Sequence, residues 1–345
     1  MTHRFPIKEI ARQAGVGLAT VDRVLNARAN VSPQTRKRVA AAIAELEGQE
    51  GQLTAKGRQL FVDIIVEAPT RFSSHIQRAA QAVLPNLAMA VFRPRFTLED
   101  MMDADDVAQT LERVRRRGSH GVCLKARDLP QVRSGVAALE AAGIPVVTLV
   151  TDLPGTPRRA YVGLDNANAG RTAAFLIAMA TKGSKGAILT CRSQDAFYGE
   201  AERFEAFCEA LKTAAPDLEV FDVSGGAGIG VQTHRRTEAM LEKHNPDVQA
   251  VYSMGGGNKA ILAALEDRGV RGLPFVAHDL DAENAHLLET GQISFVLHHD
   301  LEADMRAAFQ TIALSHGMGL PSVAPTLSDI EIITPFNRPR RQAVR

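Results

Sequence analysis

The sequence predicts a small all-α domain followed by a larger α/β domain whose sheets are parallel and doubly wound. The 345 residues suffice for two or three domains. Three helical patterns fit into the first 48 residues. From residue 60 onward, apolar runs typical of buried strands alternate with helical segments rich in Ala, Leu and Glu. Such a long β-α-β series favours parallel sheets with helices on both faces.

Charge is distributed unevenly between these two parts. Residues 1–42 hold eight Lys/Arg against two acidic residues, a net charge of +6, whereas the remainder has 32 basic and 37 acidic residues. A small basic part on a mildly acidic body indicates either a nucleic-acid-binding module or a solvated helical surface. Charge alone does not separate the two.

The remaining composition indicates a cytoplasmic protein with no membrane partner. Cys123, Cys191 and Cys208 are widely spaced and form no C-x-x-C pattern, which is typical of buried thiols in a reducing compartment. No apolar run approaches the roughly 18 residues that span a bilayer. The first ten residues are charged and lack the apolar core of a signal peptide.

The first two helices are predicted from apolar spacing and a glycine turn. Apolar residues at i, i+3, i+4 and i+7 mark one face of a helix over residues 7–14. Residues 15–17, Gly-Val-Gly, interrupt it, because glycine adopts positive φ readily. A second apolar face follows over residues 18–25. Two short helices joined by such a turn form a helix-turn-helix.

The third helix has the clearest start signal in the chain. Ser32 is a good N-cap, and Pro33 stands at the first helical position. Val39, Ile43 and Leu46 supply a buried stripe. Three basic residues lie near its first turn, where phosphate contacts are natural.

The order IKEIARQAGVGLATVDRVLN…VSPQTRKRVAAAIAELE resembles the headpiece of the lactose/galactose-repressor (LacI/GalR) family, which reads A-x-x-A-G-V-S-x-x-T-V-S-R-V-L-N and then V-S-x-x-T-R-x-x-V. The resemblance implies a sequence-specific DNA-binding transcription regulator, by default a repressor, that binds a pseudo-palindromic operator as a homodimer. A higher oligomer is left open. The implied DNA contacts are Leu18, Ala19 and Arg23 at base edges and Thr20, Asn26, Ser32 and Thr35 at phosphates.

Two residues depart from this family pattern. Gly17 replaces the usual serine and removes an N-cap hydroxyl, at a cost of only a few tenths of a kcal/mol. Asp22 replaces the serine before Arg23. A carboxylate there repels phosphates, but it can also accept a hydrogen bond from cytosine or orient Arg23 by pairing with it. These alternatives remain open from the sequence.

The segment after the headpiece also departs from the family. We place the headpiece at 1–47, an atypical linker at 48–59, and an effector-binding and dimerisation domain at 60–345. Family members usually read N-Y-x-P-N-x-x-A-R-x-L here, a hinge helix whose leucine wedges into the minor groove. This chain reads EGQEGQLTAKGR, and its three glycines each weaken a helix by roughly 1 kcal/mol. We therefore expect a more flexible linker, and the wedge is absent unless Leu53 or Leu60 replaces it.

The body resembles the periplasmic-sugar-binding-protein fold that follows the LacI/GalR headpiece. This implies two lobes joined by three crossings, with an effector in the cleft between them. Lobe 1 is expected at about 60–163 plus 296–323, and lobe 2 at about 164–295 plus 324–339. The implied ligand contacts are Arg71, Phe72, Ser73, Asp152, Phe197, Arg203, Asn258, Asp279 and His299. For Phe72, stacking on a sugar and packing in the lobe core are both open.

The expected effector is a sugar, a sugar acid or a polyol. Two arginines and a histidine favour a sugar acid or another anionic molecule over a neutral hexose. No cofactor is expected, since SGGAGIG at 224–230 does not fit the G-x-G-x-x-G pattern. No metal is expected either, because His298 and His299 are neighbours on a predicted strand and point to opposite faces.

Two other functions are alternatives to a transcription regulator. The first is a small-molecule-binding protein of the same fold with weak or non-specific DNA binding, which the altered linker favours. The second is an enzyme on a doubly wound fold, but the sequence shows no nucleophile, metal or cofactor constellation. We therefore expect no enzymatic activity.

Overall fold

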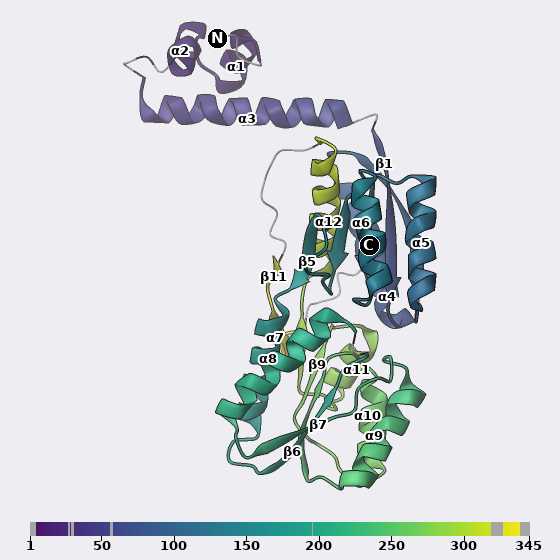
Figure 1. Cartoon of the computed structure of the whole chain (residues 1–345). Helices are drawn as coiled ribbons and strands as arrows, with labels where there is room; N and C mark the ends of the chain where they lie inside the picture. Colours follow the sequence, from purple (N-terminus) through teal and green to yellow (C-terminus); the bar gives the residue numbers. More distant parts are fainter. Residues whose placement is uncertain are drawn as a thin grey trace.

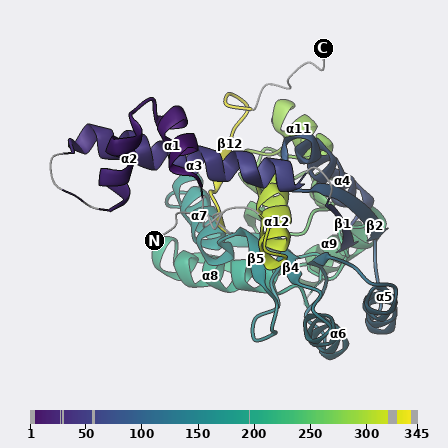
Figure 2. The same cartoon turned by 90° about the horizontal axis from the view of Figure 1, so that it is seen from above.

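The structure, a computed structural model, describes residues 5–26, 28, 31–55, 58–194, 196–318 and 327–338, and of residues 47–55 only the backbone. A helical headpiece is followed by a long helix, α3, and by two α/β lobes (Figure 1). Both views place α1 and α2 at the end of α3 that is remote from β1 (Figures 1 and 2). No helix in the described part of the chain is long and apolar enough to cross a membrane.

The headpiece has the three helices that the sequence predicts: α1 (Ile7–Ala14), α2 (Leu18–Leu25) and α3 (Pro33–Ala55). Ile10, Val21 and Val39, one from each helix, are fully buried and form its core. Gly15 has a φ of 62° and ends α1 in the left-handed conformation. Arg38 of α3 donates a 2.9 Å hydrogen bond to the last carbonyl of α1, at Ala14. Charge and apolar contacts thus join the three helices.

Helix α3 continues further than the sequence suggests. It runs to Ala55 as a helix through Gly48 and Gly51, over most of the expected linker. The cost of a glycine in a helix is a local preference of roughly 1 kcal/mol, and the Glu, Gln, Leu and Ala around these glycines favour a helix. Lys56 and Gly57 lie outside the described residues.

Lobe 1 is a six-stranded parallel sheet in the order β11-β5-β4-β3-β1-β2. Helices α4 and α12 cover one face of this sheet, and α5 and α6 cover the other (Figure 2). The strands are β1 (Gln59–Glu67), β2 (Val91–Glu99), β3 (Gly121–Lys125), β4 (Val146–Leu149), β5 (Ala160–Leu164) and β11 (Leu327–Ser328). The helices are α4 (Thr70–Val83), the short 3-10 helix η1 (Leu84–Asn86), α5 (Ala104–Arg117), α6 (Pro130–Ala141) and α12 (Leu301–Ser315).

Lobe 2 repeats this plan in the order β12-β10-β9-β8-β6-β7, with β12 antiparallel at the edge. Helices α7 and α8 cover one face, and α9, α10 and α11 cover the other. The strands are β6 (Gly186–Cys191), β7 (Leu218–Asp222), β8 (Val248–Ser253), β9 (Phe275–His278), β10 (Phe295–His298) and β12 (Glu331–Ile333). The helices are α7 (Asn166–Ala180), α8 (Tyr198–Ala214), α9 (Gly230–His244), α10 (Asn258–Glu266) and α11 (Ala282–Glu289).

The two sheets confirm the predicted fold class, but they shift the boundaries of the lobes. Strand β10 pairs with β9 and belongs to lobe 2, although the sequence boundaries assign residues 296–298 to lobe 1. Strand β11 pairs with β5 and belongs to lobe 1, although those boundaries assign residues 327–328 to lobe 2. A short apolar run has the same appearance in either sheet, so only its hydrogen-bonded neighbour decides the lobe.

A buried charged cluster joins two of the three crossings between the lobes. The chain crosses after β5, after β10 and between β11 and β12. At the second crossing, His299 Nδ1 lies 2.6 Å from Asp304 Oδ2 and His299 Nε2 lies 3.4 Å from Asp279 Oδ1. Ser328, at the third crossing, donates a hydrogen bond to the same Asp304. Burial lowers the pKa of His299, but its bonds to Asp279 and Asp304 outweigh this and raise the pKa to about 9.

Replacement of His299 by Gln is expected to remove a pH-dependent contribution to stability. The pKa of His299 rises from 6.5 in the unfolded chain to about 9 in the folded chain. The stabilisation is therefore fully present below pH 6.5 and is lost as the pH rises to 9. The measurement is urea unfolding of both proteins across this range. The difference in free energy of unfolding should shrink by about 1–3 kcal/mol; a difference that does not change with pH contradicts the assignment.

Candidate functional site

The exposed face of α2 is the candidate DNA-binding surface of the headpiece. Val21 faces the core, whereas Leu18 is 55% exposed and Arg23 is also exposed. Of the other residues proposed for DNA contact, Ala19, Asn26 and Ser32 are exposed and Thr20, Asp22 and Thr35 are partly exposed. The Ser32 hydroxyl accepts from the Thr35 amide at 3.2 Å and lies 2.8 Å from the Thr35 hydroxyl. These two hydroxyls therefore cap α3 in addition to any phosphate contact.

Asp22 is held by residues other than the one suggested by the sequence. Asn26 donates to the Asp22 carboxylate at 2.8 Å, and the Arg28 guanidinium lies 3.3 Å from it. None of the described contacts of Asp22 goes to Arg23. Residues four apart face each other on a helix and adjacent residues do not, so Asn26 is within reach and Arg23 is not. The proposed pairing of Asp22 with Arg23 is therefore absent from the structure.

The candidate ligand site is a cleft between the lobes. It is lined by residues that follow the carboxyl ends of strands in both sheets, which is where open α/β sheets bind ligands. Five of the nine residues proposed as ligand contacts line it: Arg71, Phe72, Phe197, Arg203 and Asp279. Phe72 is also packed in the core of lobe 1, which confirms that interpretation, and stacking on a sugar stays a prediction.

The other four proposed ligand residues do not line the cleft, and each contacts neighbouring groups of the protein. Ser73 donates to the Ala68 carbonyl at 2.8 Å. Asp152 forms an ion pair with Arg158 and accepts a 2.8 Å hydrogen bond from Thr148. Asn258 donates to Asn284 at 2.6 Å, and His299 belongs to the crossing cluster. These polar side chains hold the protein's own loops and helices in place.

Lys125 is a cleft residue that the sequence reasoning missed. It ends β3 and is buried, and it donates a 3.0 Å hydrogen bond to the carbonyl of Glu67. Its ammonium lies 3.9 Å from the centre of the Phe197 ring, in a cation–π contact. Burial lowers the pKa of Lys125 to about 8, so the ammonium is mostly charged at neutral pH. The feature of the sequence that could have identified it is a lysine at the end of an otherwise apolar strand.

Arg203 connects the cleft to the first crossing. Its side chain is buried on α8, and Nε donates a 2.6 Å hydrogen bond to Oδ1 of Asn166, the first residue of α7. Glu200, one turn earlier on α8, accepts 2.6 Å hydrogen bonds from both the amide and the hydroxyl of Ser193. Glu200 and Ser193 also line the cleft and were missed by the sequence reasoning. The lobe 2 wall is thus a set of polar groups in fixed orientations.

Asp279 and His278 complete this wall at the end of β9. Asp279 has a φ of 64° and is half-buried; burial raises its pKa, but the bond to His299 outweighs this and holds the pKa well below the usual range. His278 is 2.9 Å from the Tyr252 hydroxyl, and burial lowers its pKa well below the usual value. The wall thus presents a carboxylate beside a neutral imidazole.

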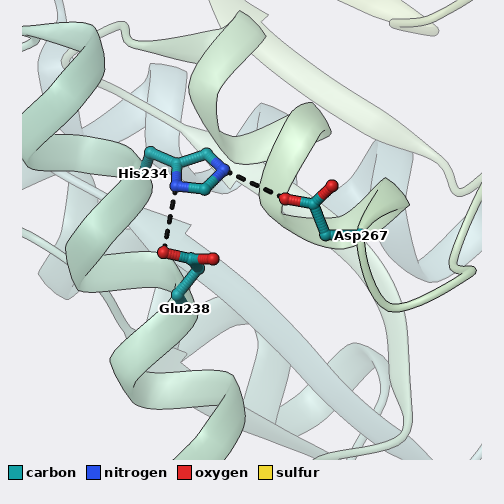
Figure 3. A group of neighbouring side chains, drawn as sticks. All are labelled: His234, Glu238 and Asp267. Carbon is teal, nitrogen blue, oxygen red and sulfur yellow. Dashed lines mark hydrogen bonds and ion pairs between the residues drawn. The ribbon is translucent and has the colours of Figure 1, made fainter.

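One group of side chains away from the cleft has the spacing of a metal site. His234 and Glu238 on α9 lie beside Asp267, at the end of α10 (Figure 3). His234 Nδ1 is 3.1 Å from Glu238 and Nε2 is 3.3 Å from Asp267. The two carboxylates therefore face different nitrogens of one ring, and an ion bound at either nitrogen displaces one of these contacts. The group acts as a link between α9 and α10.

Comparisons with known proteins agree with this architecture. Residues 6–47 match the family model of bacterial regulatory proteins, lacI family, and residues 99–314 match that of the periplasmic binding protein domain. The HTH-type transcriptional regulators TreR of Salmonella typhimurium and Escherichia coli are each 33% identical over 125 residues. This match covers 36% of the chain and 39% of each regulator, so it spans about two fifths of their length.

Solved structures share the fold of the two lobes. The glucose-galactose binding protein GanP of Geobacillus stearothermophilus has a TM-score of 0.71 at 20% identity, over 82% of this chain and 99% of GanP. A solute binding protein of Burkholderia graminis, solved with D-arabinose, also has a TM-score of 0.71, at 19% identity over 80% of this chain and 96% of its own. The chain belongs to the periplasmic binding protein domain family, whose model matches more than half of its length, and it joins this domain to a headpiece that matches the lacI family of bacterial regulatory proteins.

Proposed function

We propose that the chain is a transcription repressor that binds operator DNA as a homodimer and is controlled by a small molecule in the interlobe cleft. The observation that carries this proposal is the presence, in one chain, of a helix-turn-helix with exposed Leu18 and Arg23 and of a two-lobed cleft lined by polar side chains. Ligand binding controls DNA affinity only where the ligand has different affinities for two states of the lobes.

We further propose that the effector is a sugar-like molecule with an acidic group. Similar structures are described as binding glucose and galactose or D-arabinose, which supports a sugar-like shape. Lys125 and Arg203 make their described hydrogen bonds to uncharged oxygens, at the Glu67 carbonyl and the Asn166 amide. Both cations can therefore contribute to binding an anionic group of the ligand, beside the carboxylates of Glu200 and Asp279 that also line the cleft. Phe72 and Phe197 line the cleft as well, with the Lys125 ammonium over the Phe197 ring.

Replacement of Arg23 by Ala is expected to abolish specific DNA binding. Loss of a bidentate contact to guanine corresponds to about 1–3 kcal/mol of discrimination against the wrong base. The measurement is a gel-shift titration with DNA from upstream of the chain's own gene, against random DNA at physiological salt. Arg171→Ala, an exposed arginine on α7, is the control and should bind normally. Equal affinity of the unaltered protein for both DNAs contradicts the proposal.

Replacement of Asp22 by Ser is expected to strengthen binding to specific and random DNA alike. The change removes a negative charge and releases Asn26 and Arg28, which contact Asp22 in the structure, for phosphate contacts. Affinities for a panel of operator variants test this. A change in preference at one base pair, without a general increase in affinity, shows instead that Asp22 reads a base.

A thermal-shift screen of sugars, sugar acids and polyols is expected to show stabilisation by an acid. A ligand at 100 times its Kd stabilises the folded state by about 2.7 kcal/mol. Lys125→Met and Arg203→Gln should reduce this stabilisation, and Arg171→Ala should retain it. Tight binding of a neutral sugar without binding of its acid contradicts the proposed class of effector.

A further inference from the structure

An ion pair joins the two lobes across the cleft. Arg71, in the first turn of α4 in lobe 1, contacts the carboxylate of Asp281, the N-cap residue of α11 in lobe 2. The Asp281 side chain is 2% exposed and that of Arg71 is 25% exposed. Among the ion pairs of the described residues, this one joins the two lobes through residues that do not lie on the crossing segments. Arg71 also lines the cleft, so the pair lies at the ligand site.

Glycines of lobe 2 make room for this arginine. Gly256 has a φ of +87°, and a Cβ at this position would overlap Nη2 of Arg71. Gly228, with a φ of +67°, faces Pro69 of lobe 1, and a Cβ there would lie 2.9 Å from the proline ring. Two glycines of lobe 2 thus permit lobe 1 to approach with its Pro69–Arg71 segment. Any other residue at Gly256 is incompatible with the position of the arginine.

The two oxygens of Asp281 have separate roles. Oδ1 accepts a 2.8 Å hydrogen bond from the Asn284 amide and caps α11, whereas Oδ2 receives Arg71. Asparagine is as good an N-cap as aspartate. The change Asp281→Asn therefore removes the negative charge that pairs with Arg71 and keeps the N-cap of α11. Its effect reports on the ion pair between the lobes and not on the stability of the helix.

We propose that Arg71 is a positioning residue that clasps the two lobes through Asp281 and holds the cleft closed in the absence of ligand. The clasp sets how often the cleft opens, and it thereby controls the access of any effector. An opposite charge on lobe 2 and a glycine surface shaped for the arginine both favour closure, and neither requires a ligand. This inference concerns the resting state of the lobes, and it does not depend on the identity of the effector or on DNA binding.

The clasp is tested by hydrogen exchange on the full ligand-free chain, without DNA. Two amides report the closed state, because the amide of Asp128 donates to the Ala196 carbonyl at 2.7 Å and that of Gly199 to the Thr151 hydroxyl at 3.0 Å, each between the lobes. Asp281→Asn and Arg71→Gln should each speed exchange at both amides by about tenfold, with strand amides of both sheets unchanged. Added salt should speed exchange in the unaltered protein and not in Asp281→Asn.

Matched variants separate the clasp from general destabilisation. Arg117→Gln breaks an ion pair with Asp63 within lobe 1 and should leave both reporter amides unchanged. Gly256→Ala should open the cleft, whereas Gly269→Ala, at a φ of +75° with nothing within 4 Å of its Cβ, should not. Arg71→Lys should restore part of the protection that Arg71→Gln removes.

Two results overturn the clasp. The first is unchanged exchange at Asp128 and Gly199 in both charge variants with native circular dichroism. The second is an equal exchange rate at these two amides in Gly256→Ala and Gly269→Ala. Either result leaves the proposed regulator in place, since that proposal is tested by DNA and ligand binding.

Discussion

The buried charged cluster around Asp304 is the interaction on which the arrangement of the lobes depends. Asp304 binds His299 at one crossing and Ser328 at another, and the same imidazole lies against Asp279 at the cleft. Charges this deeply buried are tolerated only when each has its partner. The cluster therefore fixes two of the three segments that connect the lobes, and it also keeps a carboxylate ionised at the ligand site.

The cleft is connected to the remaining crossing through Arg203. Its bond to Asn166 ties the polar wall of lobe 2 to the first residue of α7, directly after β5. A ligand that moves Arg203 or Asp279 therefore acts on segments that set the angle between the lobes. Closely packed interiors change between discrete arrangements and do not deform continuously, so such contacts provide a physical basis for a switch between two states.

The sequence predicted the structure of the headpiece in more detail than the residues of the cleft. The three helices follow from apolar spacing, Gly15 and the Ser32–Pro33 start, all of which act within a few residues. At the cleft, the resemblance to family positions predicted Arg71, Arg203 and Asp279, and the scarcity of other aromatic residues predicted Phe197, but neither predicted Lys125. Asp152 and Asn258 stand at similar strand ends, yet Asp152 pairs with Arg158 and Asn258 donates to Asn284. Such partners lie on other elements, and their distance from a given residue cannot be read from spacing.

The sequence by itself determined the helix-turn-helix, the α/β class of the body and its family, because each depends on local patterns of apolar residues, glycines and caps. Only the tertiary structure decided that β10 and β11 lie in the sheets where they are found, and that Arg71 meets Asp281 over Gly256. These features depend on residues that are distant in sequence and become neighbours only when both sheets have formed. The charge partner of each buried group was therefore the property least accessible from the sequence.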